Sequence, residues 1–454
     1  MENHWRETRE GALDLTNLST KRQWIAELAR SKRGVALVSL HHVIDLEWMT
    51  EAWRLTRKDG AAGIDGMTAV DYEANLQTNL LDLLERIKSG RYQAPPVRRT
   101  YIPKADGTQR PLGIPTLEDK VAQRAIVMVL EAVYEQDFLP CSYGFRPGRS
   151  AHQALQDLRN ACMDGRLRWV LDVDIRKYFD MIAHDHLRAF LDRRVTDGVI
   201  RRMIDKWLKA GVMEDGLLHH TTKGSPQGGV VSPLLANIFL HHVLDEWYAE
   251  EVRPRLRGAS TLVRFADDFV MAFAEVRDAE RVWAVLGKRF EKYGLMLHAD
   301  KSRFVDFRPQ RPEGGDHPGT GGTTFDFLGF THVWGKSRRG YDVVRQVTAK
   351  SRFTRGLAAV DDWCRRHRHL PVLEQHRHLS MMARGHFAYY GISGNIRRVR
   401  CYGHQLVRKW KKWLSRRDNE SSFGWSKVNA LLKRLPFPRP SIIHRYTSAS
   451  EAPA

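Results

Sequence analysis

The sequence predicts an α+β protein whose last quarter is a separate, basic and helical module. Three observations support this fold class. Short apolar runs typical of strands occur among helical segments without a regular βαβ order. A glycine- and proline-rich stretch at Arg308–Gly322 interrupts the pattern and indicates a loop or hinge. Positive charge is concentrated beyond that stretch.

The charge of the chain is divided very unevenly. The 454 residues carry a net charge of +20. From Thr331 to Ala454 there are 26 Lys and Arg against 7 Asp and Glu, a net of +19, which leaves the preceding part at +1. Basic helices with interleaved aromatic residues suit a surface that follows phosphates and stacks bases, and a merely solvated basic face is the alternative. The excess predicts a nucleic-acid partner.

The cysteines, the N-terminus and the apolar runs indicate in which cellular compartment the protein is expected. The 4 cysteines are far apart and form no C-x-x-C pair, so neither a zinc finger nor a disulfide framework is predicted. The polar N-terminus has no apolar signal segment, and no apolar run reaches the length of about 18 residues that a membrane span requires. We expect a cytoplasmic protein, bacterial and with access to the nucleoid.

Helices are predicted from apolar periodicity, cap residues and glycine stops. Thr116 with Asp119, and Ser150 with Gln153, have the spacing of a capping box. The expected helices are Lys21–Arg30, Leu46–Lys58, Asp71–Lys88, Thr116–Glu135, Ser150–Cys162, one from about Asp185, Asp197–Ala210, Pro233–Glu250, Asp278–Tyr293 and several beyond Lys350.

Strands are predicted where apolar runs lie between turn residues. Arg98–Pro103 and Arg110–Ile114 flank an Asp-Gly pair and form one expected hairpin. Trp169–Ile175 reads as a buried strand, in which Asp172 and Asp174 share one face, and Leu262–Ala274 is a second expected hairpin with acidic residues at its turn.

Three aspartates stand at the ends of these strands. Asp174 ends the buried strand, and Asp267 and Asp268 occupy the turn of the second hairpin. Each one alone is ordinary, because Asp often caps its own backbone in turns. Together they offer hard oxygen ligands of the kind that Mg²⁺ prefers. Two such ions can clamp the attacking and leaving oxygens of a phosphoryl transfer.

The residues around these aspartates resemble a known family. Phe265–Asp268 resembles the Tyr-Ala-Asp-Asp fingerprint of reverse transcriptases, with Phe265 keeping the ring and losing a hydroxyl. Further segments resemble, in order, the motifs of group II intron-encoded reverse transcriptases and maturases over about residues 40–440. They are Gly60–Gly66 (N-terminal motif), Leu112–Thr116 and Ser142–Ser150 (fingers), Asp174–Asp180 (motif A), Ser225–Pro233 (motif B), Gly294–Lys301 (motif D), Phe327–Phe330 (primer grip) and Gly385–Gly391 (maturase region).

The resemblance implies a right-hand polymerase, with fingers and palm, followed by an all-helical basic thumb and maturase domain called domain X. We expect a polar arm and helix at 1–40, fingers and palm at 41–330, domain X at 331–440 and a flexible tail at 441–454. Many family members carry a C-terminal HNH nuclease with paired cysteines. We expect this chain, which ends at Ala454, to be of the bacterial type that lacks it.

The resemblance also implies roles for single residues. Asp174, Asp267 and Asp268, with the backbone carbonyl of Ile175, would hold two Mg²⁺ ions. Lys104 and Arg110 would grip the incoming triphosphate, Phe179 would be the steric gate that selects dNTPs, Gln227 would contact nucleotide or template, and Lys301 would protonate the leaving pyrophosphate. Taken without the resemblance, Lys104 and Arg110 belong to a solvated hairpin tip and Phe179 is ordinary core packing. Gln227 then lies in a glycine-rich loop without a ligand, and Lys301 is a solvated lysine.

The expected activity is RNA-directed DNA synthesis, combined with binding of structured group II intron RNA that assists splicing and retromobility. The expected partners are an RNA template, a DNA primer, dNTPs and intron RNA. Three alternatives stay open. One is a free-standing group II-like reverse transcriptase used in host defence or repair, and another is a polymerase-inactive, RNA-binding splicing cofactor. The third is an RNA-dependent RNA polymerase, against which Phe179 at the gate position argues.

Overall fold

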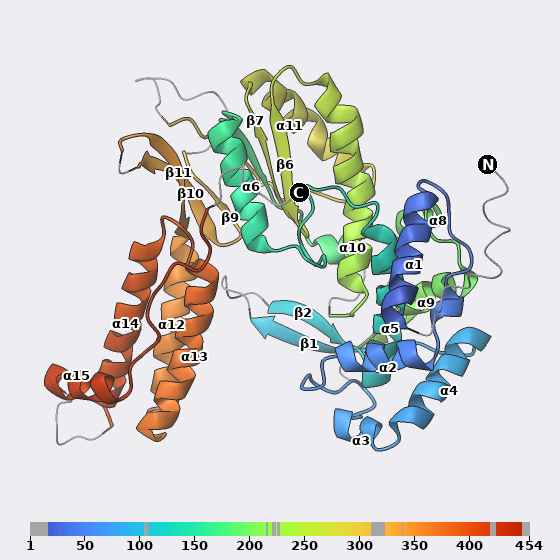
Figure 1. Ribbon diagram of the computed structural model, residues 1–454, viewed down its shortest axis with the longest axis horizontal. Helices are drawn as coiled ribbons and strands as arrows, with labels where there is room; N and C mark the ends of the chain where they lie inside the picture. The colour runs from blue at the N-terminus through green and yellow to red at the C-terminus, as the bar shows by residue number, and fades with distance from the viewer. Residues whose placement is uncertain are drawn as a thin grey trace.

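The elements of the protein form three groups in the computed structural model (Figure 1). N-terminal helices and a small sheet lie on one side, a four-stranded sheet flanked by helices lies in the middle, and C-terminal helices lie on the other side. The structure describes residues 17–103, 107, 109–214, 217–219, 224, 228–309, 323–337, 339–417 and 424–446.

Helix α5 (Leu117–Tyr134) is the centre of the N-terminal group. It is buried on nearly every side, because α1 (Leu18–Ser31), α2 (Leu46–Leu55) and α4 (Leu76–Ser89) lie against it. The indole N–H of the buried Trp48 donates to the carbonyl of Ala125 at 2.9 Å and joins α2 to α5. A short helix, α3 (Ala69–Glu73), and a 3₁₀ turn at His41–Val43 complete this part.

A small sheet extends from these helices in the strand order β2-β1-β4-β5. Its hairpin pairs Arg98 with Ile114 at the open end and Pro103 with Gln109 at the turn. The strands are β1 (Val97–Pro103), β2 (Gln109–Ile114), β4 (Val212–Glu214), which runs parallel to β1, and β5 (Leu217–His219), which is antiparallel to β4.

The central sheet has the order β6-β7-β3-β8, and all its neighbouring strands are antiparallel. The strands are β3 (Trp169–Val173), β6 (Ser260–Phe265), β7 (Asp268–Phe273) and β8 (Arg303–Asp306). Helix α6 (Ala151–Asp164) packs on the face that carries Val170, and α11 (Val276–Glu291) packs on the face that carries Leu171. Burial on both faces explains why four of the five residues of β3 are apolar.

Short helices connect the two sheets. They are α7 (Tyr178–Met181), α8 (His184–Asp192), α9 (Gly198–Lys209) and α10 (Ser232–Leu240), and helical turns continue α10. These turns are π-helical over His241–Asp245 and Trp247–Val252, and a 3₁₀ turn at Arg253–Arg255 ends them.

The C-terminal group begins with strands and continues with helices. A three-stranded sheet of order β11-β10-β9 consists of β9 (Phe325–Phe327), β10 (Phe330–Lys336) and β11 (Asp342–Thr348). The helices that follow are α12 (Lys350–Arg366), α13 (Val372–Tyr390), α14 (Ile396–Leu414) and α15 (Trp425–Arg434). Trp410 is fully buried in their core, and its indole N–H donates to Gln375 at 2.9 Å.

Most of the expected elements are confirmed, with four differences. The helix expected at Asp71–Lys88 is broken at Ala74 and Asn75, since Asn favours helix ends. The helix expected at Pro233–Glu250 changes to π-helical turns after Leu240. Ser150 forms a full capping box, whereas the carboxylate of Asp119 is bonded elsewhere and only Thr116 caps α5.

The fourth difference concerns the expectation that residues 331–440 are all helical. It is wrong for the first part, because β10 and β11 form a hairpin there. Valine and threonine make up six of the fourteen residues of these two strands, and such β-branched side chains favour strands. The helical character begins at Lys350. Among the described residues, no helix is long and apolar enough to cross a membrane.

Candidate active site

The three aspartates singled out in the sequence come together at one end of the central sheet. The turn between β6 and β7 holds Asp267, and Phe265 pairs with Asp268 across it. Val173 at the end of β3 lies opposite Phe269. Continuing this register by one residue brings Asp174 opposite Asp268. The hairpin and the buried strand therefore supply three neighbouring carboxylates.

The carboxylates at this end of the sheet repel one another. Solvent reaches Asp268, but the surrounding protein and, after it, the charges of Asp172, Asp267 and Asp174 raise its pKa to about 7. The backbone N–H of Leu328 donates to Asp268 and acts in the opposite direction on this pKa. Such a concentration of negative charge favours a bound cation.

The residues fit divalent metal ions by donor type. Carboxylate oxygens are the ligands that Mg²⁺ prefers, and three of them share one end of the sheet. Their oxygens do not all lie within 4.8 Å of one another, so they do not form the closed ligand shell of a single ion. Ile175 directly follows Asp174; its side chain is buried, and it forms an isolated antiparallel bridge with Leu297.

The side chain of Arg264 holds the aspartate turn from inside the protein. Arg264 is fully buried in β6, and its guanidinium donates to both carboxylate oxygens of Asp245 at 2.8 and 2.5 Å. It also donates to the carbonyl of Ala266 at 3.0 Å, directly before Asp267. Further donations reach Asn237 at 2.9 Å and Ser142 at 2.8 Å. The turn is therefore fixed by a completely bonded arginine.

The segment Ser142–Ser150, predicted to belong to the fingers, packs against the same turn. Ser142 forms a parallel bridge with Arg264. A Cβ on Gly144 would lie 2.4 Å from the backbone nitrogen of Ala266, so only glycine allows this approach. Phe145 follows with a positive φ of 56° and 58% of its side chain exposed. Sequence reasoning did not single out Phe145, although its ring centre lies 6.4 Å from that of Phe265.

The segment Gly294–Lys301 borders Asp174. The ammonium of Lys301 lies 3.4 Å from a carboxylate oxygen of Asp174, and Lys301 is 58% exposed. The backbone N–H of His298 donates to the carbonyl of Asp174 at 2.8 Å, and the hydroxyl of Ser302 accepts from the Asp174 N–H at 3.2 Å. Lys301 is thus the one predicted cation that the structure brings directly to a predicted carboxylate among the residues it describes.

A turn of the third sheet connects the aspartates to the C-terminal helices. Leu328 lies between β9 and β10 in the left-handed region, at φ 49°. The hydroxyl of Tyr389, in α13, donates to the carbonyl of Leu328 at 2.8 Å. The N–H of Leu328 in turn donates to Asp268. The C-terminal helices therefore reach the aspartate site through Leu328.

The structure describes some of the remaining predicted site residues and not others. Phe179 lies partly buried in α7, five residues after Asp174, and its carbonyl oxygen would lie 3.1 Å from a Cβ on Gly224. Arg110 lies in β2, opposite Ile102 in β1. Lys104 and Gln227 are outside the residues that the structure describes.

Among the described residues, one group of side chains has ligand atoms that all lie within 4.8 Å, namely His241, His242 and Glu246. It lies at the π-helical turns after α10. The Nδ1 of His242 lies 2.7 Å from Glu246, and the guanidinium of Arg193 lies 3.6 Å from the same carboxylate. Glu246 therefore already has imidazole and guanidinium partners within the protein.

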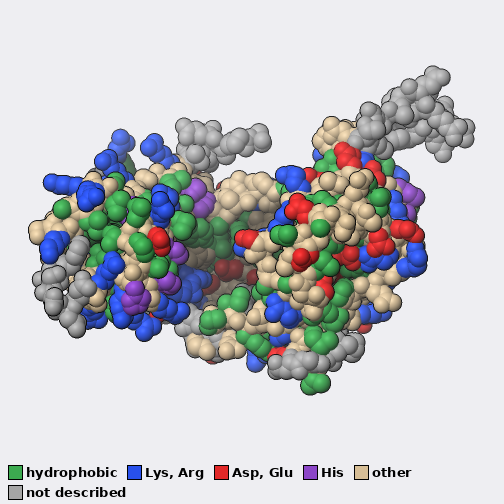
Figure 2. Space-filling model, turned by 90° about the horizontal axis from the view of Figure 1, so that it is seen from below, with side chains coloured by type: hydrophobic (Ala, Val, Ile, Leu, Met, Phe, Trp, Pro, Cys, Tyr) green, Lys and Arg blue, Asp and Glu red, His purple; other side chains and the backbone are tan. Residues whose placement is uncertain are grey.

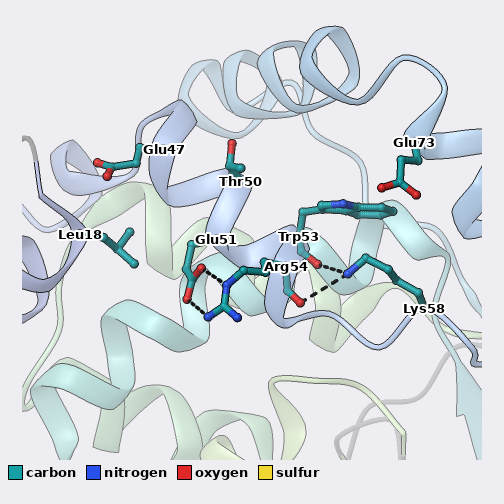
Figure 3. Close-up of a pocket in the computed structure, with 8 residues that line it drawn as sticks. All are labelled: Leu18, Glu47, Thr50, Glu51, Trp53, Arg54, Lys58 and Glu73. Carbon is teal, nitrogen blue, oxygen red and sulfur yellow. Dashed lines mark hydrogen bonds and ion pairs between the residues drawn. The ribbon is translucent and has the colours of Figure 1, made fainter.

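A pocket of about 590 Å³ opens on the N-terminal helices, away from the aspartates (Figure 3). Its acidic residues are Glu47, Glu51 and Glu73, and Arg54 pairs with Glu51 at 2.6 Å. The ammonium of Lys58 donates to the carbonyl of Trp53 at 3.0 Å. Two basic side chains thus stand against three acidic ones, and all the lining residues lie in the N-terminal helices and the segments that join them, far in the sequence from the aspartates.

The surface separates charge between two lobes. Figure 2 shows lysine and arginine gathered on the lobe of the C-terminal helices, and a hollow with acidic side chains between the lobes. One exposed stripe of α14 carries Arg397, Arg400, His404 and Arg408, at helical spacing, while Val399 on the opposite face is buried. The basic module predicted from the sequence thus offers an accessible cationic helix face.

A sheet that carries paired aspartates in a hairpin turn and a third at the end of the neighbouring strand has the donor groups of an enzyme of metal-dependent phosphoryl transfer. Residues 102–332 match the family model described as "Reverse transcriptase (RNA-dependent DNA polymerase)". This range is slightly more than half of the chain. The chain therefore belongs to the reverse transcriptase family, the RNA-directed DNA polymerases, and its mixed α/β fold is consistent with the right-hand architecture of that class.

Individual relatives show which reverse transcriptases the chain is similar to. The chain is 38% identical over 258 residues to "Protein YkfC" of Escherichia coli, which covers 50% of this chain and 67% of that protein. It is 43% identical over 162 residues to "Group II intron-encoded protein LtrA" of Lactococcus lactis, covering 36% of this chain and 27% of LtrA. It is 30% identical over 155 residues to "Nuclear intron maturase 4, mitochondrial" of Arabidopsis thaliana, covering 34% and 19%. The expected kinship with group II intron reverse transcriptases and maturases is confirmed.

Proposed function

We propose that the chain extends DNA primers on RNA by nucleotidyl transfer that depends on two Mg²⁺ ions bound by Asp174, Asp267 and Asp268. The observation that supports this proposal most is the meeting of the three carboxylates at one end of the central sheet. Two ions there would neutralise the attacking and leaving oxygens of the phosphoryl transfer. Primer extension on an RNA template, with and without one of these aspartates, tests the proposal.

Four further side chains would supply the remaining functions. Lys301, 3.4 Å from Asp174 and exposed, is able to turn toward the leaving pyrophosphate and give it a proton. Lys104 and Arg110 would bind the triphosphate of the incoming dNTP, and Gln227 would contact the nucleotide or template. The backbone carbonyl of Ile175 completes the proposed metal ligands. In this arrangement the protein positions the reactants and balances charge.

Phe179 is proposed to exclude the ribose 2′-hydroxyl. We expect Phe179→Ala to incorporate ribonucleotides and to lower the preference for dNTP over rNTP by about 10²-fold, the order that shape discrimination in an apolar pocket supplies. The measurement is kcat/KM for dTTP and UTP on the same RNA-templated primer. Phe179→Tyr, which keeps the ring, is the control and should retain the preference. A Phe179→Ala enzyme that uses dTTP normally and still rejects UTP contradicts the assignment.

We further propose that the C-terminal helices bind structured intron RNA and thereby assist splicing and retromobility. The support is the exposed basic stripe of α14 and the printed names of the relatives, which include an intron-encoded protein and an intron maturase. Single-stranded and structured RNA both offer phosphates to such a helix face.

This RNA binding should depend steeply on salt. If about six phosphates are neutralised, the affinity falls by about 10³-fold between roughly 50 and 200 mM salt. The triple change Arg397→Gln, Arg400→Gln and Arg408→Gln should reduce the slope of log K against log salt by about 3, one for each lost phosphate contact. The measurement is a filter-binding or fluorescence titration of the full chain with structured RNA.

The matched control removes three exposed lysines from the opposite lobe, Lys32→Gln, Lys88→Gln and Lys209→Gln. It lowers the net charge equally and should leave the slope almost unchanged. A slope that is flat in the wild type, or that changes equally in both triple variants, contradicts a phosphate-binding role for α14.

A further inference from the structure

Asp119 is a buried carboxylate whose partners are three neutral donors. It lies in the first turn of α5 with 2% of its surface exposed. One of its oxygens accepts from the hydroxyl of Tyr92 and from the indole N–H of Trp207, both at 2.6 Å. The other accepts from the side-chain amide of Gln123 at 2.9 Å. Because all three groups donate, the carboxylate acts only as an acceptor.

The hydrogen bonds continue from Asp119 to the motif B loop, which we define as Gly228–Val231. Gln123 is buried, and its carbonyl oxygen accepts from the backbone N–H of Val231 at 3.1 Å. The orientation of the Gln123 carboxamide is therefore set from both ends. Asp119 binds its NH₂ group, and Val231 binds its oxygen. This places a side-chain relay between α5 and the loop.

The motif B loop is wedged between the small sheet and α10. A Cβ on Gly228 would lie 2.4 Å from the carbonyl oxygen of Gly113 in β2, so the loop contacts this strand backbone to backbone. Val231 directly precedes Ser232, where α10 begins. Later in α10, Asn237 donates to the carbonyl of Gly144 at 2.7 Å, at the aspartate turn. A displacement of the loop would therefore be transmitted to the backbone of β2 and, through α10, to Gly144 beside the aspartate turn.

We propose that Asp119 and Gln123 are positioning residues that hold the motif B loop in the place required for binding the incoming nucleotide. They touch no substrate and act through the Val231 backbone. The effect on nucleotide binding rests on the proposed polymerase function, whereas the effect on the loop does not.

The chemistry of the relay gives a decisive pair of substitutions. In Asp119→Asn, the remaining oxygen keeps the Tyr92 and Trp207 donors, so the new NH₂ group faces the NH₂ group of Gln123. Gln123 must then rotate its carboxamide and present NH₂ to the Val231 N–H, where no hydrogen bond forms. Gln123→Glu alone places two carboxylates against each other.

The two substitutions together should compensate for each other. In the double variant, the carboxylate introduced at position 123 accepts from the amide introduced at position 119 with one oxygen. Its other oxygen accepts from the Val231 N–H. Every donor of the relay then faces an acceptor again, so the loop should return to its original place.

The experiment measures two quantities on the full chain. One is KM for dTTP in RNA-templated extension, and the other is hydrogen exchange of the Val231 amide region by mass spectrometry. Each single variant should raise KM about tenfold, the effect of one lost hydrogen bond, and should speed up exchange. The double variant should return both quantities to within about threefold of the wild type.

Two controls separate positioning from general stability. Tyr92→Phe removes one donor but leaves the orientation of Gln123, so KM should stay unchanged. Val129→Ala opens a small cavity in the buried part of α5, so it should lower the melting temperature without changing KM.

The outcomes are distinguishable. Faster exchange and raised KM in both single variants, with both restored in the double variant, support the proposal. Wild-type values in the single variants, or a double variant as impaired as they are, overturn it. A change in hydrogen exchange of the Val231 region without any change in KM also overturns the proposed link to nucleotide binding. If the wild-type chain does not polymerise, the proposed function fails, and the exchange data alone decide whether the relay holds the loop.

Discussion

Replacing Asp245 by asparagine should lower the free energy of unfolding by about 3–5 kcal/mol, the usual cost of breaking a buried ion pair from one side. Arg264 and Asp245 are both completely shielded from solvent. The substitution leaves a buried guanidinium without its counter-charge, and the new NH₂ group faces N–H donors. The measurement is urea unfolding at equilibrium, in which the midpoint should fall while the slope stays constant.

The same substitution should also remove polymerase activity, because Arg264 donates to the carbonyl of Ala266 beside Asp267. Asp362→Asn is the matched control. Asp362 forms exposed ion pairs with Arg365 and Arg366 on the surface of α12, and its loss should not change stability measurably. If Asp245→Asn lowered the free energy of unfolding as little as the control does, the view that Arg264 and Asp245 hold the aspartate turn would be contradicted.

Replacing Asp267 by asparagine should reduce RNA-templated primer extension by at least about 10³-fold and leave the fold and RNA binding intact. A lost metal ligand removes several kcal/mol of transition-state stabilisation, and about 1.4 kcal/mol corresponds to a factor of ten. The turn around Asp267 is held by the backbone and by Arg264, so the conservative change should not disturb it.

Asp300→Asn is the control for Asp267→Asn. Asp300 is an exposed aspartate beside Lys301, and its substitution removes the same charge from the same region. It should leave extension within about threefold of the wild type, as expected for an exposed surface residue. If Asp267→Asn instead lost RNA binding together with activity, or had a clearly lower melting temperature, Asp267 would be a structural residue.

The aspartate site was predictable because its signals are local in the sequence. A buried strand that ends in Asp174, and a hairpin with Asp267 and Asp268 at its turn, follow from apolar patterning and turn chemistry. The motif resemblance then connects the two segments. Their antiparallel pairing in one sheet is what the structure adds.

The supports of the site were missed because they join residues far apart in the chain. Arg264 contacts Ser142, which lies 122 positions earlier, and the relay from Gln123 reaches Val231 across 108 positions. A signal was nevertheless present. An arginine inside an apolar strand, and the pair Asp119 and Gln123 inside an apolar helix, are polar groups at core positions. Buried polar groups require partners, so such residues identify hidden networks even when the partners are unknown.

The expectation of an all-helical C-terminal module failed for a different reason. The resemblance implies a helical domain X over residues 331–440, whereas the helical pattern of the sequence itself begins only beyond Lys350. The alternation of buried and less buried residues in β10, from Phe330 to Val333, is strand-like and was outweighed by the helical pattern beyond Lys350. The division of the chain into domains at residues 40, 330 and 440 stays a prediction.

The most direct test of the central claim is extension of a poly(rA)/oligo(dT) duplex with dTTP and Mg²⁺, with the wild type and Asp267→Asn compared side by side. We predict extension by the wild type, loss of extension when the metal is chelated, and none by the variant, while both proteins bind RNA equally. Equal extension by both proteins would place the chemistry elsewhere. No extension by either, with RNA binding intact, would contradict the polymerase account and favour an RNA-binding splicing cofactor.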